Sequence, residues 1–289
     1  MSRAAWPAPA KLNLFLQVVG RRPDGFHDIQ TAFQLIDLCD SLYFEPRPGP
    51  AIRRLGGPAE VPEPEDLCLR AARRLQQIAG GRAGVDIRLL KRIPVQGGLG
   101  GGSSDAATTL VALNEIWGLG LDVAELARLG RELGADVPLF VHGRSAWGEG
   151  VGDLLTPIDL PQRYFAIVHP GVGVRTAEVF QAIELTRNSP RTTIRGFLKA
   201  GGRNDCEPVV AGRNPEVARA LAWLAVRGNA RLTGTGSCVF AQFDAPGAAE
   251  AALADLPAAW SGYVARGLDR SPLQERLAAE RSSHDGGQV

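Results

Sequence analysis

A glycine- and serine-rich segment at residues 94–107, PVQGGLGGGSSDAA, holds the residue types best suited to bind a phosphate group. Glycines let backbone N–H groups approach an anion closely, and they adopt positive φ angles without strain. The alanine-rich stretch that follows predicts a helix, whose N-terminus adds unpaired N–H donors and a partial positive charge. We therefore interpret the segment as a phosphate-binding loop that leads into a helix.

The sequence on either side of the loop supports this interpretation. An alternating pattern over residues 85–90 predicts a strand before it, and apolar residues at helical spacing within 106–117 predict a helix after it. We expect Ser103, Ser104 and Asp105 to cap that helix. A flexible glycine linker is the alternative, but a linker has no reason to join a strand to an amphipathic helix. The loop lacks both the GxxxxGK[ST] pattern of a P-loop and the GxGxxG of a dinucleotide site.

Four other short segments follow one another along the chain in the order of the motifs of one protein family: PAPAKLNL at 7–14, RPDGFH at 22–27, GADVP at 134–138 and LTGTGS at 232–237. With these segments and the glycine loop, the chain resembles the GHMP kinases, small-molecule kinases that bind ATP without a Walker lysine. The first two segments are the most specific, and they are similar to those of the subfamily that phosphorylates 4-diphosphocytidyl-2-C-methyl-D-erythritol. The resemblance covers nearly the whole chain.

The resemblance implies an α+β fold of two domains with the active site in the cleft between them. A ribosomal-S5-like, ATP-binding domain is expected over residues 1–155, and a ferredoxin-like substrate domain over 156–267, with 268–283 packing back on the first domain. The implied reaction is ATP-dependent phosphorylation of the 2-hydroxyl of the cytidyl substrate. Its products would be the 2-phosphate and ADP, in the non-mevalonate route to isoprenoid precursors.

Lys11 and Asp136 are the catalytic residues that the resemblance implies, since they lie in its PAPAKLN and GADVP segments. From the residues alone, Lys11 could equally be a solvated surface lysine, and Asp136 could be a helix cap. In the implied mechanism, Asp136 accepts the proton of the attacking hydroxyl as general base. Lys11 stabilises the negative charge of that carboxylate and of the phosphoryl oxygens.

The resemblance also implies how ATP and magnesium bind. The expected phosphate-binding residues are Pro94, Val95, Gln96, Gly97, Gly98, Leu99, Gly100, Gly101, Gly102, Ser103 and Ser104. Leu67, Cys68 and Lys91 fall where relatives bind adenine, and Ser104 with the ATP phosphates is expected to hold Mg2+. Two positions depart from the family pattern: Gln96 replaces a small residue, and Asp66 replaces an asparagine.

Five residues match positions that bind the cytidyl substrate in this subfamily. Phe26 and Phe180 would sandwich the cytosine ring, and His27 would read its polar edge. Asn13 and Thr176 would lie near the methylerythritol hydroxyls and the phosphates. The alternatives are ordinary ones: both phenylalanines could be core residues, and His27 could be a surface histidine.

The composition limits the possible classes of function but does not identify one. A chain of 289 residues with 45% hydrophobic residues can bury the cores of two domains. Its 32 basic and 31 acidic side chains give no overall field that would attract nucleic acid or an anionic membrane. The four cysteines are scattered without a CxxC pair, and no apolar run is long enough to cross a bilayer. We therefore expect a cytoplasmic protein that binds neither nucleic acid nor a membrane. The resemblance implies a small-molecule substrate, and we expect a monomer or a weak homodimer.

Periodicity predicts the order of the regular elements. Strands are expected at residues 12–19, 41–45, 85–90, 164–168, 230–233, 238–243 and 263–265. Helices are expected at 67–79, 106–117, 123–133, 176–182, 215–226 and 247–256, and loops or an edge hairpin at 46–64.

Two other functions stay open, a homoserine or mevalonate type of GHMP kinase and a catalytically silent nucleotide-binding module. The DGFH and PAPAKLN segments disfavour the first, and the presence of both Lys11 and Asp136 disfavours the second.

Overall fold

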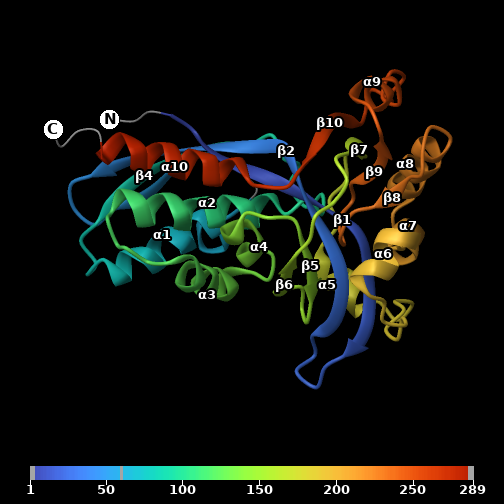
Figure 1. The fold of residues 1–289 in the computed structure, drawn as a ribbon, viewed down its shortest axis with the longest axis horizontal. Helices are drawn as coiled ribbons and strands as arrows, with labels where there is room; N and C mark the ends of the chain where they lie inside the picture. The colour runs from blue at the N-terminus through green and yellow to red at the C-terminus, as the bar shows by residue number, and fades with distance from the viewer. Residues whose placement is uncertain (1–3, 59–60, 286–289) are drawn as a thin grey trace.

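The structure, a computed structural model, describes residues 4–58 and 61–285. Its strands join into one extended sheet with helices on its faces (Figure 1). The strands are β1 (Trp6–Arg21), β2 (His27–Arg47), β3 (Ile52–Gly56), β4 (Gly84–Leu90), β5 (Ala146–Glu149), β6 (Leu154–Pro157), β7 (Tyr164–His169), β8 (Arg231–Leu232), β9 (Val239–Phe243) and β10 (Ser261–Leu268).

The helices are α1 (Leu67–Ile78), α2 (Gly101–Ile116), α3 (Val123–Leu133), α4 (Val137–His142), α5 (Thr176–Gln181), α6 (Ile194–Ala200), α7 (Glu207–Arg213), α8 (Pro215–Ala225), α9 (Pro246–Ala251) and α10 (Pro272–Asp285), with a 3-10 turn at Glu63–Glu65. All the predicted helices are present. In the described ranges, α4, α6, α7 and α10 were not predicted as helices. No helix there combines the length and the apolar character that crossing a membrane requires.

A long antiparallel hairpin, β1 with β2, runs from the N-terminal half, past the C-terminal half, to a turn at the bottom of the view (Figure 1). The strands predicted at 12–19 and 41–45 are only parts of it, so those bounds were too short. Both strands are buried along most of their length, including polar residues such as Gln34 and Asp40, so their sequences lack the regular alternation of a half-buried strand. Along its length, β2 also pairs with β4, β5 and β10, which makes it the central strand of the sheet.

The segment after β2 does not form the hairpin considered as one possibility for residues 46–64. Instead, β3 lies at the edge of the sheet and pairs in parallel with β4, which itself pairs antiparallel with β2. Behind these strands, α1 and α2 pack against one another and bury a core that includes Leu75, Ile87 and Leu110. This core fixes the loop that connects β4 to α2.

The helix after the glycine loop begins earlier than predicted. Its first residue is Gly101, and its N-cap is Gly100, which has a φ of 73° and no side chain to cap with. The prediction that Ser103, Ser104 and Asp105 cap the helix was therefore wrong, because all three lie inside its first turns. The orphan N–H groups at this helix end are thus left to a ligand or to water.

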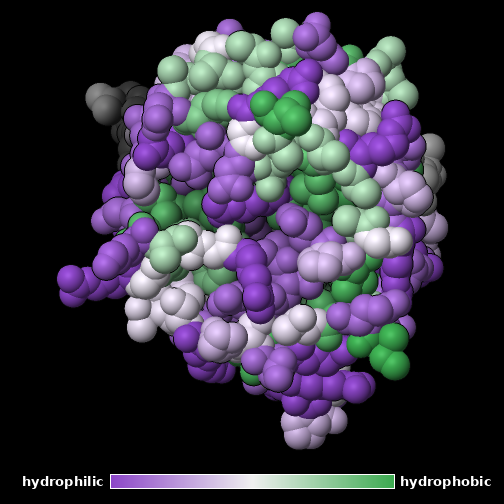
Figure 2. All heavy atoms as spheres, turned by 90° about the vertical axis from the view of Figure 1, so that its right-hand side faces the viewer, coloured by the Kyte–Doolittle hydropathy of each residue, from purple (hydrophilic) through white to green (hydrophobic). Residues whose placement is uncertain are grey.

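The strands of the C-terminal half follow the order β10–β7–β9–β8 and are antiparallel. Side chains alternate between two cores: Ala166 and Val168 face α7, α8 and α9, whereas Phe165 and Ile167 face the side of β1 and β5. Helices therefore cover one face of this sheet, as predicted from the order of elements. Figure 2 views the molecule from this end and shows hydrophilic and hydrophobic residues interspersed on its surface.

The C-terminal end of the chain returns to the N-terminal half. β10 pairs with β2 through Gly267 and Leu268, and α10 then packs on β1 and α2. Leu273 of α10 is fully buried in the core of the first half, and Arg276 lies over the Trp6 ring at 4.5 Å. The two halves share one sheet, and the proposed division at residues 155 and 267 stays a prediction.

The burial of Leu273 generates a stability prediction. Leu273→Ala should lower the free energy of unfolding by about 2–5 kcal/mol, since it removes a fully buried side chain from a packed core. Denaturant unfolding measures the loss. The matched control is Leu198→Ala in α6, where the side chain is 49% exposed and the expected loss is small. Equal losses for both variants would show that α10 does not hold the N-terminal core.

Candidate active site

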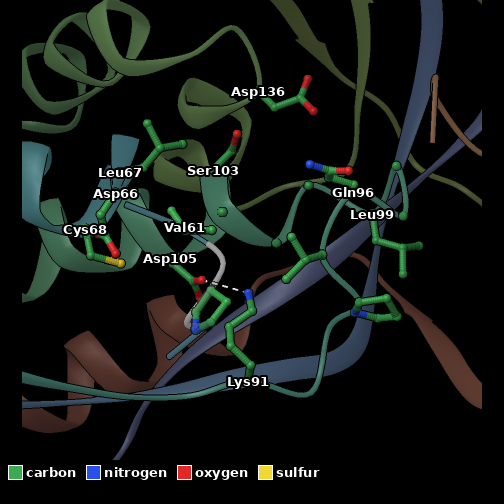
Figure 3. A pocket seen from close by; sticks show the side chains of 18 of the residues that line it. Val61, Asp66, Leu67, Cys68, Lys91, Gln96, Leu99, Ser103, Asp105 and Asp136 are labelled. Atoms are coloured by element: carbon green, nitrogen blue, oxygen red, sulfur yellow. Dashed lines mark hydrogen bonds and ion pairs between the residues drawn. The ribbon is translucent and has the colours of Figure 1, made fainter. Parts of the chain in front are cut away.

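A cavity of about 460 Å³ lies where the glycine loop meets the rest of the molecule. Its lining combines the loop with residues distant in sequence (Figure 3). The lining residues are Lys11, Pro58, Val61, Glu65, Asp66, Leu67, Cys68, Leu89, Lys91, Pro94, Val95, Gln96, Gly97, Gly98, Leu99, Gly100, Gly101, Gly102, Ser103, Asp105, Asp136, Thr176 and Thr235. The cavity therefore contains all of the predicted ATP-binding residues except Ser104, and both predicted catalytic residues.

The glycine loop is held in a conformation that few other sequences could adopt. Gly98 and Gly100 have φ angles of 80° and 73°, in the left-handed region that favours glycine. Gln96 also has a positive φ, 56°, and is the one non-glycine residue in the described part of the chain that does. The residue noted in the sequence as unusually bulky at this point thus occupies a backbone conformation that is uncommon for it.

A second loop, from the LTGTGS segment, packs directly on the glycine loop. The Cys238 N–H donates to the Gly97 carbonyl at 3.0 Å. A Cβ at Gly236 would collide with the backbone of Gly97 and Gly98, and one at Gly98 with the Thr233 carbonyl. The glycines of both loops are therefore needed for the close approach of two backbones. On the other side, the Lys11 N–H donates to the Leu99 carbonyl at 3.0 Å and fixes the loop to β1.

Lys11 and Asp136 lie together at the wall of the cavity. The Lys11 Nζ is 3.5 Å from Asp136 Oδ2, and the lysine side chain is 5% exposed, against 31% for the aspartate. Asp136 precedes α4 but makes no side-chain capping hydrogen bond. Lys11 is thus not the solvated lysine that was one alternative, and Asp136 does not use its carboxylate as a cap. Figure 3 shows Asp136 on the opposite side of the cavity from Lys91.

The ammonium group of Lys11 has further partners that fix its position. It donates to the Asn13 side chain at 2.5 Å and to the Gly98 carbonyl at 2.9 Å. Asn13 itself is buried, donates to Thr31 at 2.8 Å through its side chain, and donates to Thr233 at 2.9 Å through its backbone. Asn13 therefore orients the lysine in this structure, and it is not among the residues that line the cavity.

The opposite side of the cavity carries a buried cluster of charges. Lys91 donates to Asp105 at 2.8 Å and also to Asp40, so one ammonium group lies between two carboxylates (Figure 3). Burial raises the pKa of the Asp105 carboxyl to about 7, against the lowering influence of Lys91. Cys68 lies nearby, and burial holds the pKa of its thiol well above the usual range, so it remains a neutral wall residue.

Asp66, the departure from the family asparagine, is neutralised within the protein. Its carboxylate accepts from the Leu69 N–H at 2.9 Å, which caps α1, and forms an ion pair with Arg54. Both interactions are internal to the wall of the cavity. The carboxylate thus serves the helix start and the edge strand β3, from which Arg54 extends.

The two serines of the loop differ in where they lie. Ser103 lines the cavity, whereas Ser104 is fully buried, does not line it, and its hydroxyl has no hydrogen-bond partner within the described structure. The expectation that Ser104 holds a metal stays a prediction. Across residues 4–58 and 61–285, no group of three or more histidine, cysteine or acidic side chains is placed to bind a metal ion.

Two of the predicted substrate residues, Thr176 and Phe180, lie on α5, which leads away from the cavity. Thr176 lines the cavity and exchanges a hydrogen bond of 2.8 Å with Thr235. Phe180 lies one turn further along the same helix, and its ring stacks on His27 with centroids 5.2 Å apart. His27 is only 8% exposed, so it is not a surface histidine, and Phe26 is 64% exposed, so it is not a core residue.

Sequence reasoning missed several residues of this region. Thr235 belonged to a quoted motif without a role, and Asp105 was interpreted as a cap. Arg187, which donates to His27 at 3.1 Å, carries no local signal at all, because its partner is 160 residues away. Only the three-dimensional arrangement reveals it.

The chain matches the family models of the GHMP kinases N terminal domain over residues 66–144 and GHMP kinases C terminal over 182–262. It is 57% identical to 4-diphosphocytidyl-2-C-methyl-D-erythritol kinase of Alkalilimnicola ehrlichii, with 97% of this chain and 96% of the relative covered. The chain belongs to this family of GHMP kinases. The enzyme of the same name from Halorhodospira halophila is 53% identical over 95% of this chain and 96% of the relative.

Solved structures agree with this membership. A crystal structure of 4-(cytidine 5'-diphospho)-2C-methyl-D-erythritol kinase matches with a TM-score of 0.81 and 33% identity, over 91% of this chain and 99% of that one. A mevalonate kinase structure matches with a TM-score of 0.67 but only 16% identity, over 92% of this chain and all of that one, and so shares the fold alone. The two-domain GHMP kinase fold predicted from the sequence is confirmed, and the protein is a small-molecule kinase.

Gly102 offers a test of nucleotide binding that spares the fold. It lines the cavity, and a Cβ there would meet only Leu67 Cδ1, at 3.7 Å. Gly102→Val should therefore leave the melting temperature unchanged while it fills space in the cavity, and the Kd for ATP should rise at least about tenfold. Calorimetric titration measures this. The control is Gly212→Val in α7, where a Cβ would meet nothing within 4 Å. Unchanged ATP affinity in Gly102→Val would remove the cavity as the nucleotide site.

Proposed function

We propose that this kinase transfers the γ-phosphoryl group of ATP to the 2-hydroxyl of 4-diphosphocytidyl-2-C-methyl-D-erythritol. The observation that carries the proposal is that Asp136 and its partner Lys11 lie on the same cavity wall as the glycine loop. The names of the relatives support the substrate, and their identity of 50% or more extends over nearly the full chain. ADP and the 2-phosphate would be the products.

Asp136 would act as the general base in this reaction. As the substrate hydroxyl oxygen bonds to the γ-phosphorus, the bond between that phosphorus and the β–γ bridging oxygen breaks, and ADP leaves. The hydroxyl proton passes to a carboxylate oxygen of Asp136, which is exposed to the cavity. Lys11 would stabilise the negative charge of the carboxylate before this proton transfer and that of the phosphoryl oxygens as the new bond forms.

The glycine loop would bind the phosphates of ATP. Backbone N–H groups at the N-terminus of α2 have no capping side chain, and the helix dipole favours an anion there. On the other side of the cavity, Leu67, Cys68 and Leu89 supply apolar surface suited to an adenine ring. Lys91 stays paired with two carboxylates, so we assign it to the structure of this wall rather than to the phosphates.

Magnesium would be held mainly by the phosphates. The ion takes oxygen ligands and keeps several waters, and it needs no carboxylate cage when a nucleotide supplies oxygens. The hydroxyl of Ser103 faces the cavity, and we therefore place it ahead of Ser104 as a protein ligand. When bound, the ion would offset the charge of the transferred phosphoryl group.

The general base can be tested directly. Asp136→Asn removes the proton acceptor but keeps the size of the side chain, so kcat should fall at least about 100-fold while ATP still binds. Steady-state kinetics and calorimetry give the two values. Asp122→Asn is the matched control, because Asp122 only caps α3 and asparagine caps a helix as well. A kcat near the wild-type value in Asp136→Asn would exclude Asp136 as the base.

The cytidyl group would bind between Phe26 and Phe180. The exposed ring of Phe26 adjoins His27 in sequence, and the Phe180 ring stacks on that histidine. The stacked pair of Phe180 and His27 lies one helical turn from Thr176 on the cavity, and Phe26 would supply the second ring. This site distinguishes the proposed substrate from homoserine or mevalonate, which carry no base to stack.

The base preference follows from this site. The wild-type enzyme should have a higher kcat/KM for the cytidyl substrate than for its uridyl analogue, because uracil exchanges a donor and an acceptor with cytosine. Phe26→Ala should weaken binding of the cytidyl substrate by about 1–3 kcal/mol without changing ATP binding. Ile183→Ala, at a side chain that is 88% exposed, is the control. Equal wild-type efficiencies for the two substrates would mean that no base is read.

A further inference from the structure

Arg187 connects two residues of the proposed base site, His27 and Phe180. Its Nε donates to His27 Nε2 at 3.1 Å. Its terminal nitrogens donate to the carbonyls of Phe180, Ala182 and Leu185 at 3.1, 2.6 and 3.0 Å. The guanidinium group therefore donates to carbonyls at the end of α5 and in the segment that follows it, and its Nε–H holds the imidazole that begins β2.

These contacts determine where the proton of His27 lies. A guanidinium group is a donor only, so the Nε2 atom that it contacts must be an acceptor. In a neutral imidazole the proton is then on Nδ1. Burial lowers the pKa of His27, and the positive charges of Arg187 and Arg21 lower it further, so the neutral form prevails near pH 7. Nδ1 has no hydrogen-bond partner among the described residues.

The same arginine also fixes the stacked pair as a unit. Phe180 is held through its backbone carbonyl and His27 through its ring, and the two rings stack at an interplanar angle of 22°. Without Arg187, the carbonyls of Phe180 and Ala182 would lose a charged donor, and His27 could take either tautomer.

We propose that Arg187 is a positioning residue for substrate recognition, which holds His27 with Nδ1 as the N–H donor and keeps Phe180 stacked beside it. The inference rests on the proposed cytidyl substrate. An N–H donor matches the ring N3 of cytosine, an acceptor, and is mismatched against the N3–H of uracil. Arg187 thereby sets base selectivity through His27 without touching the base.

The first test uses the wild-type protein and does not depend on any variant. Nitrogen-15 NMR of the labelled enzyme at pH 7 reports which ring nitrogen of each histidine is protonated, and His27→Gln assigns the signal. We expect Nδ1 of His27 to be protonated and Nε2 to be the acceptor. A signal from the opposite tautomer would overturn the proposal. If the wild-type enzyme has this tautomer but does not phosphorylate the cytidyl substrate, the proposed function fails instead.

The second test separates positioning from a general structural role. Arg187→Met should raise KM for the cytidyl substrate at least about tenfold, reduce its advantage over the uridyl analogue, and leave KM for ATP unchanged. Its His27 signal should show a mixture of tautomers. Arg187→Lys, which keeps one charged donor, should lie between Arg187→Met and wild type.

The matched control is Arg213→Gln, which removes an arginine that pairs at 2.7 Å with Glu184 in the same segment but does not contact His27. It should behave as wild type. Equal rises of both KM values in Arg187→Met, or an unchanged preference between the two bases, would mean that Arg187 only stabilises the fold, and would overturn the proposal.

Discussion

The structure of the site depends on one buried positive charge. An ammonium group taken out of water is costly unless it is paired, and Lys11 is almost fully buried in the middle of β1. Its three polar partners come from different segments: Asp136 before α4, the Gly98 carbonyl in the glycine loop, and Asn13 on β1 itself. The charge that the chemistry needs is therefore also what brings the base and the phosphate loop to one place. The long β1–β2 hairpin supplies the rigid support, because β1 pairs along its length with β2, the central strand of the sheet.

The substrate end of the site is assembled on a different principle. One short helix, α5, links the two regions, with Thr176 on the cavity and Phe180 against His27. A helix of six residues has little stability of its own, so its end is held by the guanidinium group of Arg187. The nucleotide end is thus fixed by the sheet, while the base end is fixed by side-chain hydrogen bonds to backbone carbonyls.

The sequence predicted some elements closely and others poorly, for local reasons. Helix α3 has the predicted bounds because Asp122 and Glu125 form a capping box and Gly134 follows its last residue. The hairpin was underestimated because bulges interrupt its register and buried polar residues such as Gln34 and Asp40 break its pattern. In the site, the structure places most of the motif residues on the cavity wall. Which of Ser103 and Ser104 faces the cavity could not be predicted, because it depends on the residue at which α2 begins. The contact of Arg187 with His27 depends on tertiary structure alone.

The contact between the two glycine loops limits how the molecule can move. Gly236 and Gly98 leave no space for a side chain between them, and the Cys238–Gly97 hydrogen bond crosses the same boundary. Sliding of one half past the other along this boundary would have to break that hydrogen bond and separate the two loops. The boundary therefore resists shear between the two halves, and the loops keep their shape on this side of the cavity.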